Sequence, residues 1–71
     1  MMENVREQIG AELRALRLSR GLTTRALAEL AGIGYAHIAR IEAGKYNLRV
    51  DTVAKIAEAL GARLEIVKND E

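Results

Sequence analysis

The chain lacks several residue types, and each absence narrows what it can be. It has no cysteine among its 71 residues, which excludes disulfides and thiolate metal sites and fits a reducing cytoplasm. With a single histidine and no cysteine to join it, no metal site and no cofactor are expected. Phenylalanine and tryptophan are also absent and aromatic residues amount to 3%, so the core has to be aliphatic.

Long apolar runs and catalytic constellations are missing as well. No run approaches the roughly 20 apolar residues of a membrane-spanning helix, and the first residues lack the apolar centre of a signal peptide. The chain has one serine, Ser19, and no pair of carboxylates stands near a base in a spacing typical of active sites. No glycine-rich loop follows a predicted strand. We therefore expect neither an enzyme nor a membrane protein.

Charge is balanced overall but unevenly distributed. The net charge is +1, yet residues 14–49 carry seven basic side chains against two acidic ones, and the remainder carries four against eight. Such segregation indicates one positive and one negative region, although it is also compatible with ordinary solvated surface charge. A chain of this length is one small domain that buries about 60% of its unfolded surface.

Hydrophobic spacing predicts a helical domain. Apolar residues recur at helical intervals in four segments, and glycines end most of them. Gly10 lies inside the first segment, which indicates close approach of another helix. Positions expected to face the core include Leu27, Leu30, Ala31, Ile38, Ile41, Val50 and Val53. The predicted helices span residues 3–19, 24–31, 35–43 and 50–61.

The period changes after Gly61. Residues 62–67 alternate, with Leu64 and Ile66 on one side and Arg63, Glu65 and Val67 on the other, which is typical of a short strand. A lone strand in a helical chain has no partner within the chain. The simplest partner is the same strand of a second copy of the chain. We therefore predict a domain over residues 1–61, followed by a dimerisation element over residues 62–71.

Residues 24–43 match the spacing of a helix-turn-helix unit. Two short helices are joined by about three residues with Gly32 at the bend, where it supplies a backbone angle that a side chain would resist. Ala28 is small where the second helix crosses. The seven positions that fit this unit together are Leu27, Ala28, Ala31, Gly32, Ile33, Ile38 and Ile41.

The helix predicted over residues 35–43 has an outward face suited to reading DNA bases. With Ile38 and Ile41 buried, Ala36, Ala39 and Arg40 point outward and Tyr35 lies at the exposed start. Arginine can bind guanine bidentately, and alanine can contact a thymine methyl group. The plainer alternatives are a solvated Arg40, a Tyr35 packed against the loop, and alanines that only favour helix.

Contacts to DNA phosphates are expected beside this helix. Thr24 and Arg25 lie at the start of the preceding helix, where backbone N–H groups favour an anion. His37 is interpreted as a capping or phosphate-facing side chain. Lys45, after the helix, adds a positive charge.

These motifs together resemble a known family. The stretch GLTTRALAELAGIGYAHIARIEAGKYNLRVDTVAKIAEALG is similar to Cro and phage-repressor-like helix-turn-helix domains of the xenobiotic-response-element type, and the resemblance covers residues 5–61. It departs from the usual pattern at Thr24, Gly34 and Leu48. The resemblance implies an all-α repressor-like domain of four to five helices. The ending LGARLEIV is more similar to antitoxins, in which a C-terminal strand pairs across a dimer.

The resemblance also implies residue roles and partners. It implies backbone-to-phosphate bonds in the loop that contains Lys45, Tyr46 and Asn47. It implies that Arg17 and Glu42 form a structural ion pair. It predicts a cytoplasmic, homodimeric transcriptional repressor that binds double-stranded DNA at an inverted repeat. The alternatives are an antitoxin with a toxin partner and, from another class, a helical protein-interaction module.

Overall fold

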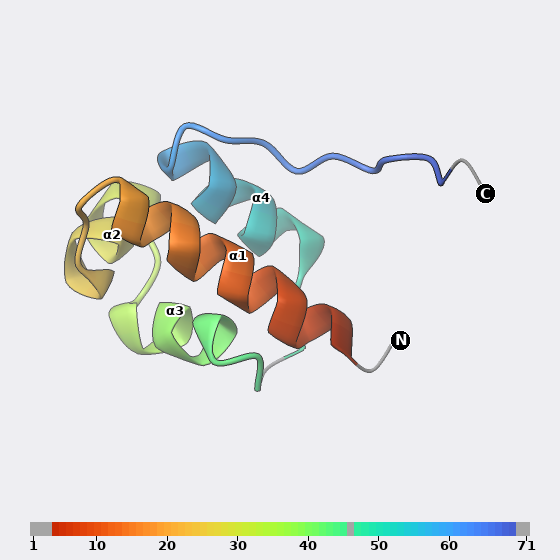
Figure 1. The fold of residues 1–71 in the computed structure, drawn as a ribbon. Helices are drawn as coiled ribbons and strands as arrows, with labels where there is room; N and C mark the ends of the chain where they lie inside the picture. Colours follow the sequence, from red (N-terminus) through yellow and green to blue (C-terminus); the bar gives the residue numbers. More distant parts are fainter. Residues whose placement is uncertain (1–3, 46, 70–71) are drawn as a thin grey trace.

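Four helices make up the fold. The computed structural model describes residues 4–45 and 47–69, and its helices are α1 (Val5–Ser19), α2 (Thr24–Ala31), α3 (Tyr35–Glu42) and α4 (Val50–Ala59) (Figure 1). Where the predicted and observed ends can be compared, they differ by no more than two residues. The described residues contain no β-strand. The all-α prediction is confirmed, with four helices over this part of the chain.

The core is aliphatic, as the composition requires. Helix α1 packs on α3, and α2 packs on both α3 and α4. Leu27, Ile38 and Ile56 are each 0% exposed and lie at the centre of this contact. The buried apolar residues are Leu13, Leu27, Ala28, Ala31, Ile38, Ile41, Val53, Ile56, Ala57 and Leu60.

Two residues predicted for the core are on the surface. Leu30 is 62% exposed and Val50 is 68% exposed. Leu27 and Ala31 lie at the centre of the apolar stripe of α2, and Leu30 lies at its edge. The Leu30 side chain therefore reaches the flank of α4 near Lys55 rather than the interior. Val50 is in the first turn of α4, at the rim of a surface groove. At these places the core is formed by Leu27, Ala31 and Val53, while Leu30 and Val50 lie at its border.

The turn between α2 and α3 has the predicted backbone geometry. The Thr23 hydroxyl accepts a hydrogen bond from the Ala26 N–H at 3.0 Å and caps α2. Gly32 ends α2 with φ at +71°, a conformation that a side chain would strain. Gly34 then occupies the N-cap of α3, and Ile33 packs against the core from within the turn. These contacts fix the angle at which α3 leaves α2.

Gly10 allows α1 and α3 to touch backbone to backbone. A Cβ atom at this position would lie 2.8 Å from the carbonyl oxygen of Glu42 and closer still to that of Ile41. The predicted close approach of another helix is confirmed, and that helix is α3.

The C-terminal segment is extended and leaves the helical body. After Gly61 the chain turns back and runs beside α4, and residues 62–69 form neither helix nor strand (Figure 1). Leu64 is 45% exposed and Ile66 is 97% exposed. The predicted strand needs a second chain to pair with, so it and the division at residue 61 stay predictions.

Candidate nucleic-acid interface

Helix α3 presents a smooth outer face. Ala36, Ala39 and Arg40 are exposed, whereas Ile38 and Ile41 on the opposite side are 0% and 1% exposed. The Arg40 side chain makes no hydrogen bond or ion pair with any other residue that the structure describes. Two methyl groups and one guanidinium therefore form a face whose only long side chain is a fork of hydrogen-bond donors.

Tyr35 and Arg25, predicted for different tasks, lie together. The Arg25 guanidinium carbon is 4.1 Å from the centre of the Tyr35 ring, a cation–π contact between the first turns of α2 and α3. The ring is 46% exposed. The stacking fixes the orientation of the ring beside the outer face of α3. It also holds the Arg25 charge at the edge of the same surface.

The start of α2 lies beside this pair. Thr24 is the first residue of α2 and is half-buried, while Thr23 supplies the N-cap. Thr23, rather than Thr24, caps the helix. The Thr24 hydroxyl therefore remains at the helix start, where backbone N–H groups point outward.

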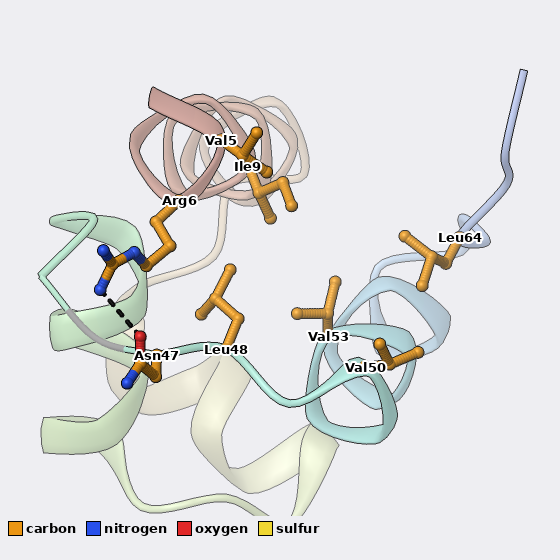
Figure 2. Close-up of a pocket in the computed structure, with 8 residues that line it drawn as sticks. All are labelled: Val5, Arg6, Ile9, Asn47, Leu48, Val50, Val53 and Leu64. Carbon is orange, nitrogen blue, oxygen red and sulfur yellow. Dashed lines mark hydrogen bonds between the residues drawn. The ribbon is translucent and has the colours of Figure 1, made fainter. Parts of the chain in front are cut away.

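Basic side chains from three segments surround a second part of the interface. An open hollow of about 580 Å³ is lined by one residue of α1, one of α3 and three of the following loop. Within it, Arg6 donates a hydrogen bond from Nη1 to Asn47 Oδ1 at 2.9 Å (Figure 2). That bond occupies the amide oxygen of Asn47, so its NH₂ group can point to an incoming acceptor. The lining residues are Arg6, His37, Lys45, Asn47 and Arg49, which we call the basic hollow.

The basic hollow brings together predicted and unpredicted residues. His37, Lys45 and Asn47 were predicted to bind phosphate, and the structure brings all three to one hollow. Arg6 and Arg49 were not predicted. Arg6 belongs to the acidic remainder of the chain, and only its helical phase relative to Gly10 indicates that it faces α3. Tyr46, also predicted to bind phosphate, lies outside the described residues.

Arg17 and Glu42 form a bidentate ion pair away from the exposed face. Arg17 donates from Nε to Glu42 Oε2 at 2.8 Å and from Nη2 to Oε1 at 2.9 Å. Its Nη1 donates to the carbonyl oxygen of Leu22 at 2.8 Å. The two side chains are 9% and 7% exposed. One arginine thus ties α1 to the end of α3, as the resemblance implies, and also to the turn before α2.

Electrostatics keep the Arg17 side chain of this pair charged. The hydrogen bond with Glu42 raises the pKa of Arg17, burial opposes that shift, and attraction to the Glu42 charge adds to it. Because the folded pKa is raised, the stabilisation that depends on the Arg17 charge is complete below the ordinary arginine pKa and is lost as the pH rises through the folded pKa.

Metal ligands do not gather in the described part of the chain. Within residues 4–45 and 47–69, no three histidine, cysteine, aspartate or glutamate side chains are placed to hold one ion. Over the same residues, no helix combines the length and apolar character that crossing a bilayer requires.

Comparison with known proteins identifies relatives of this arrangement. The family model of the helix-turn-helix domain matches residues 8–66. The chain is 47% identical over 55 residues to the HTH-type transcriptional repressor RghR of Bacillus subtilis, covering 76% of this chain and 41% of RghR. It is 33% identical over 63 residues to the immunity repressor protein of Bacillus phage phi105, covering 89% and 44%. The chain thus spans less than half the length of these curated relatives.

A solved structure extends the similarity towards the C-terminal segment. A toxin–antitoxin module from Streptococcus pneumoniae superimposes with a TM-score of 0.73 at 35% identity, covering 93% of this chain and 73% of that one. The likeness reaches beyond the helix-turn-helix unit and covers most of the chain.

Proposed function

Because this chain belongs to the helix-turn-helix domain family, we propose that it is a sequence-specific regulator that binds double-stranded DNA and represses transcription. The observation that carries the proposal is the outer face of α3, where two alanines and one arginine are exposed on a helix anchored from behind. The repressors that the chain resembles support the same class of function, which is repression of transcription. The proposal includes no catalysed reaction, and it places the protein in the cytoplasm with its DNA.

Helix α3 enters the major groove with this face forward. A groove about 12 Å wide admits a helix, and short side chains let it approach the base edges closely. Arg40 donates to O6 and N7 of a guanine, and Ala36 and Ala39 contact neighbouring bases, with a thymine methyl group as the natural partner of an alanine. Tyr35, held by Arg25, offers its hydroxyl group at the edge of the groove.

Phosphate contacts flank the helix on both sides. Thr24 and Arg25 bind the backbone at one edge, through the start of α2. The basic hollow binds it at the other edge, where Lys45 and Arg6 supply charge and Asn47 supplies an N–H donor. These phosphate contacts set the position of α3 on the duplex, while its contacts to base edges determine which DNA sequence is bound.

Two copies bind one operator. Repressors of this architecture place two recognition helices about 34 Å apart in successive major grooves of an inverted repeat. We assign the dimer contact to the extended segment that contains Leu64 and Ile66. Bound in this way at a promoter, the dimer blocks access to it.

An antitoxin that represses its own promoter is the second candidate. The Streptococcus toxin–antitoxin structure supports it because its likeness covers 93% of this chain. DNA binding is common to both candidates, so a toxin partner is the distinguishing property. A small toxin encoded beside the gene, and co-purifying with this chain, would favour the antitoxin; a neighbour without toxicity would favour the plain repressor.

Replacing Arg40 by alanine is expected to weaken binding to the best operator by about 1–3 kcal/mol and to relax discrimination at one base pair of each half-site. The guanidinium is the only side chain on the outer face that can make a bidentate contact. Quantitative binding to an operator and to its single-base variants measures both effects. Unchanged discrimination would remove Arg40 from base reading.

Replacing Lys45 or Arg6 by alanine is expected to weaken all duplexes about equally and to flatten the slope of log K against log salt by about one unit. Each change removes one phosphate contact from the basic hollow. Lys68 is the matched control, because Figure 1 shows the C-terminal segment on the opposite side of the fold from α3. A slope that changes for Lys68→Ala as much as for Lys45→Ala would contradict a contact localised at the hollow.

A further inference from the structure

Two apolar side chains of the C-terminal segment are left almost uncovered by the described part of the chain. Ile66 is 97% exposed and Val67 is 79% exposed. Leu64, two residues earlier, turns towards the helices and is 45% exposed. Ala62, Leu64 and Ile66 share one face of an extended chain, because side chains alternate along it. Ile66 is thus exposed on the same face of the segment as Leu64, the face that turns towards the helices.

Leu64 forms a wall of two hollows in the surface. The larger, about 400 Å³, is lined by Val5, Ile9, Leu48, Val50 and Val53, with Arg6 and Asn47 at one end (Figure 2). The smaller, about 100 Å³, lies between the extended segment, α1 and α4. Its lining includes Leu13, Leu16, Ala57, Ala62 and Leu64, together with the charged residues Glu12 and Arg63. Both hollows are mainly apolar, and the small side chain of Ala62 leaves the smaller one open beneath the segment.

We propose that the smaller hollow receives Ile66 of a second copy, through antiparallel pairing of the two C-terminal segments about a two-fold axis at Leu64. This inference rests on the proposed dimer and adds its register and its contact. Two identical antiparallel strands are related by an axis perpendicular to their sheet, so one residue faces its own copy. With Leu64 at that place, Ile66 of the partner subunit lies directly opposite Ala62, over the hollow.

Charge selects this register among the alternatives. With Leu64 at the axis, Arg63 of each chain lies opposite Glu65 of the other, which forms two cross-strand pairs of opposite charge. With the axis at Glu65, two carboxylates face each other, and with the axis at Arg63, two guanidinium groups do. Within one chain these side chains are only loosely paired, 3.8 Å apart with Arg63 82% exposed and Glu65 59% exposed. Both are therefore available to a second strand.

Single introduced cysteines test the register, because the chain has no cysteine of its own. Opposite residues of an antiparallel pair have Cα atoms about 4.5–5.5 Å apart, which a disulfide spans, whereas diagonal neighbours are about 7–8 Å apart. Leu64→Cys is therefore expected to give a covalent dimer on mild oxidation, and Glu65→Cys is not. A covalent dimer through Glu65→Cys in place of Leu64→Cys, or through neither, overturns the proposal.

Truncating Ile66 tests the contact. Ile66→Ala is expected to raise the dimer dissociation constant about 100-fold, since each dimer loses two buried side chains. Val67→Ala is the matched control: it removes a comparable side chain from the opposite face and is expected to change the constant less than about threefold. Sedimentation equilibrium measures both, with circular dichroism to verify folding. Equal effects of the two changes would contradict a hollow specific for Ile66.

A mixing experiment tests the charge pairs between chains. Arg63→Glu and Glu65→Arg each put like charges opposite one another in their own homodimers, whereas a mixture of the two proteins restores two opposite-charge pairs. The heterodimer is expected to be about tenfold tighter than either homodimer. Because each variant keeps a repulsive pair within its own chain, only pairing between chains can produce this gain. A mixture no tighter than its components overturns the register.

These outcomes separate the inference from the proposed function. Failure of the Leu64→Cys dimer while the wild type still binds duplex with an Arg40-dependent preference contradicts the strand pairing alone. Absence of any duplex binding by the wild type contradicts the proposed function, whatever the oxidised cysteine variants show.

Discussion

Replacing Glu42 by alanine is expected to lower the free energy of unfolding by about 3–5 kcal/mol. The change leaves the Arg17 guanidinium buried with two of its three hydrogen bonds removed, since only the bond to the Leu22 carbonyl remains. A domain of 71 residues has roughly 4–10 kcal/mol of stability in total. The variant is therefore expected to be barely folded at room temperature.

The comparison variants separate the buried charge from the loss of the pair. Glu29→Ala removes an exposed carboxylate from α2 and is expected to change stability by less than about 0.5 kcal/mol. Arg17→Met combined with Glu42→Leu removes both charges and is expected to cost far less than Glu42→Ala, because no charge is left unpaired. Urea unfolding followed by circular dichroism gives all three values. A loss below about 1 kcal/mol for Glu42→Ala would contradict the structural role of the pair.

Replacing Gly10 by alanine is expected to destabilise the domain by about 1–3 kcal/mol, although alanine favours helix by about 1 kcal/mol. The added methyl group would overlap the carbonyl oxygens of Ile41 and Glu42, which belong to backbone and cannot rotate away. Helices α1 and α3 would have to separate. Because the same contact anchors the end of α3, DNA binding is expected to weaken in the same variant.

Ala11 calibrates the effect of helix propensity alone. It is the next residue of α1 and is exposed, so Ala11→Gly is expected to cost about 0.5–1 kcal/mol without altering any helix contact. Thermal and urea unfolding of both variants give the comparison. If Gly10→Ala stabilised the domain by the amount that Ala11→Gly destabilises it, the close approach of the two helices would be wrong.

The sequence predicts the helices well because their limits are local properties. The glycine at 32 and the threonines at 23 and 24 mark ends that depend on backbone conformation and capping, and the structure has these ends. Leu30 and Val50 were misplaced because periodicity gives the direction of a side chain but not the extent of the neighbouring helix. At the edges of a core that extent decides burial.

Part of the candidate interface could also be predicted, because it depends on the local geometry of one helix. The outward placement of Ala36, Ala39 and Arg40 follows from the spacing of Ile38 and Ile41 along one helix. The bond between Arg6 and Asn47 joins residues 41 positions apart and depends on how α1 crosses the loop after α3. The stacking of Arg25 on Tyr35 likewise depends on the angle between two helices. Contacts of this kind need the tertiary arrangement.

Guanine-N7 methylation interference, on a duplex selected by this protein from a random pool, tests the entry of α3 into the major groove most directly. N7 lies in the major groove, beside the atoms that Arg40 would bind. We expect methylation of one guanine in each half of an inverted repeat to block binding, with the halves one helical turn apart. Failure to select any duplex, or full binding to the N7-methylated site, would contradict a recognition helix at α3.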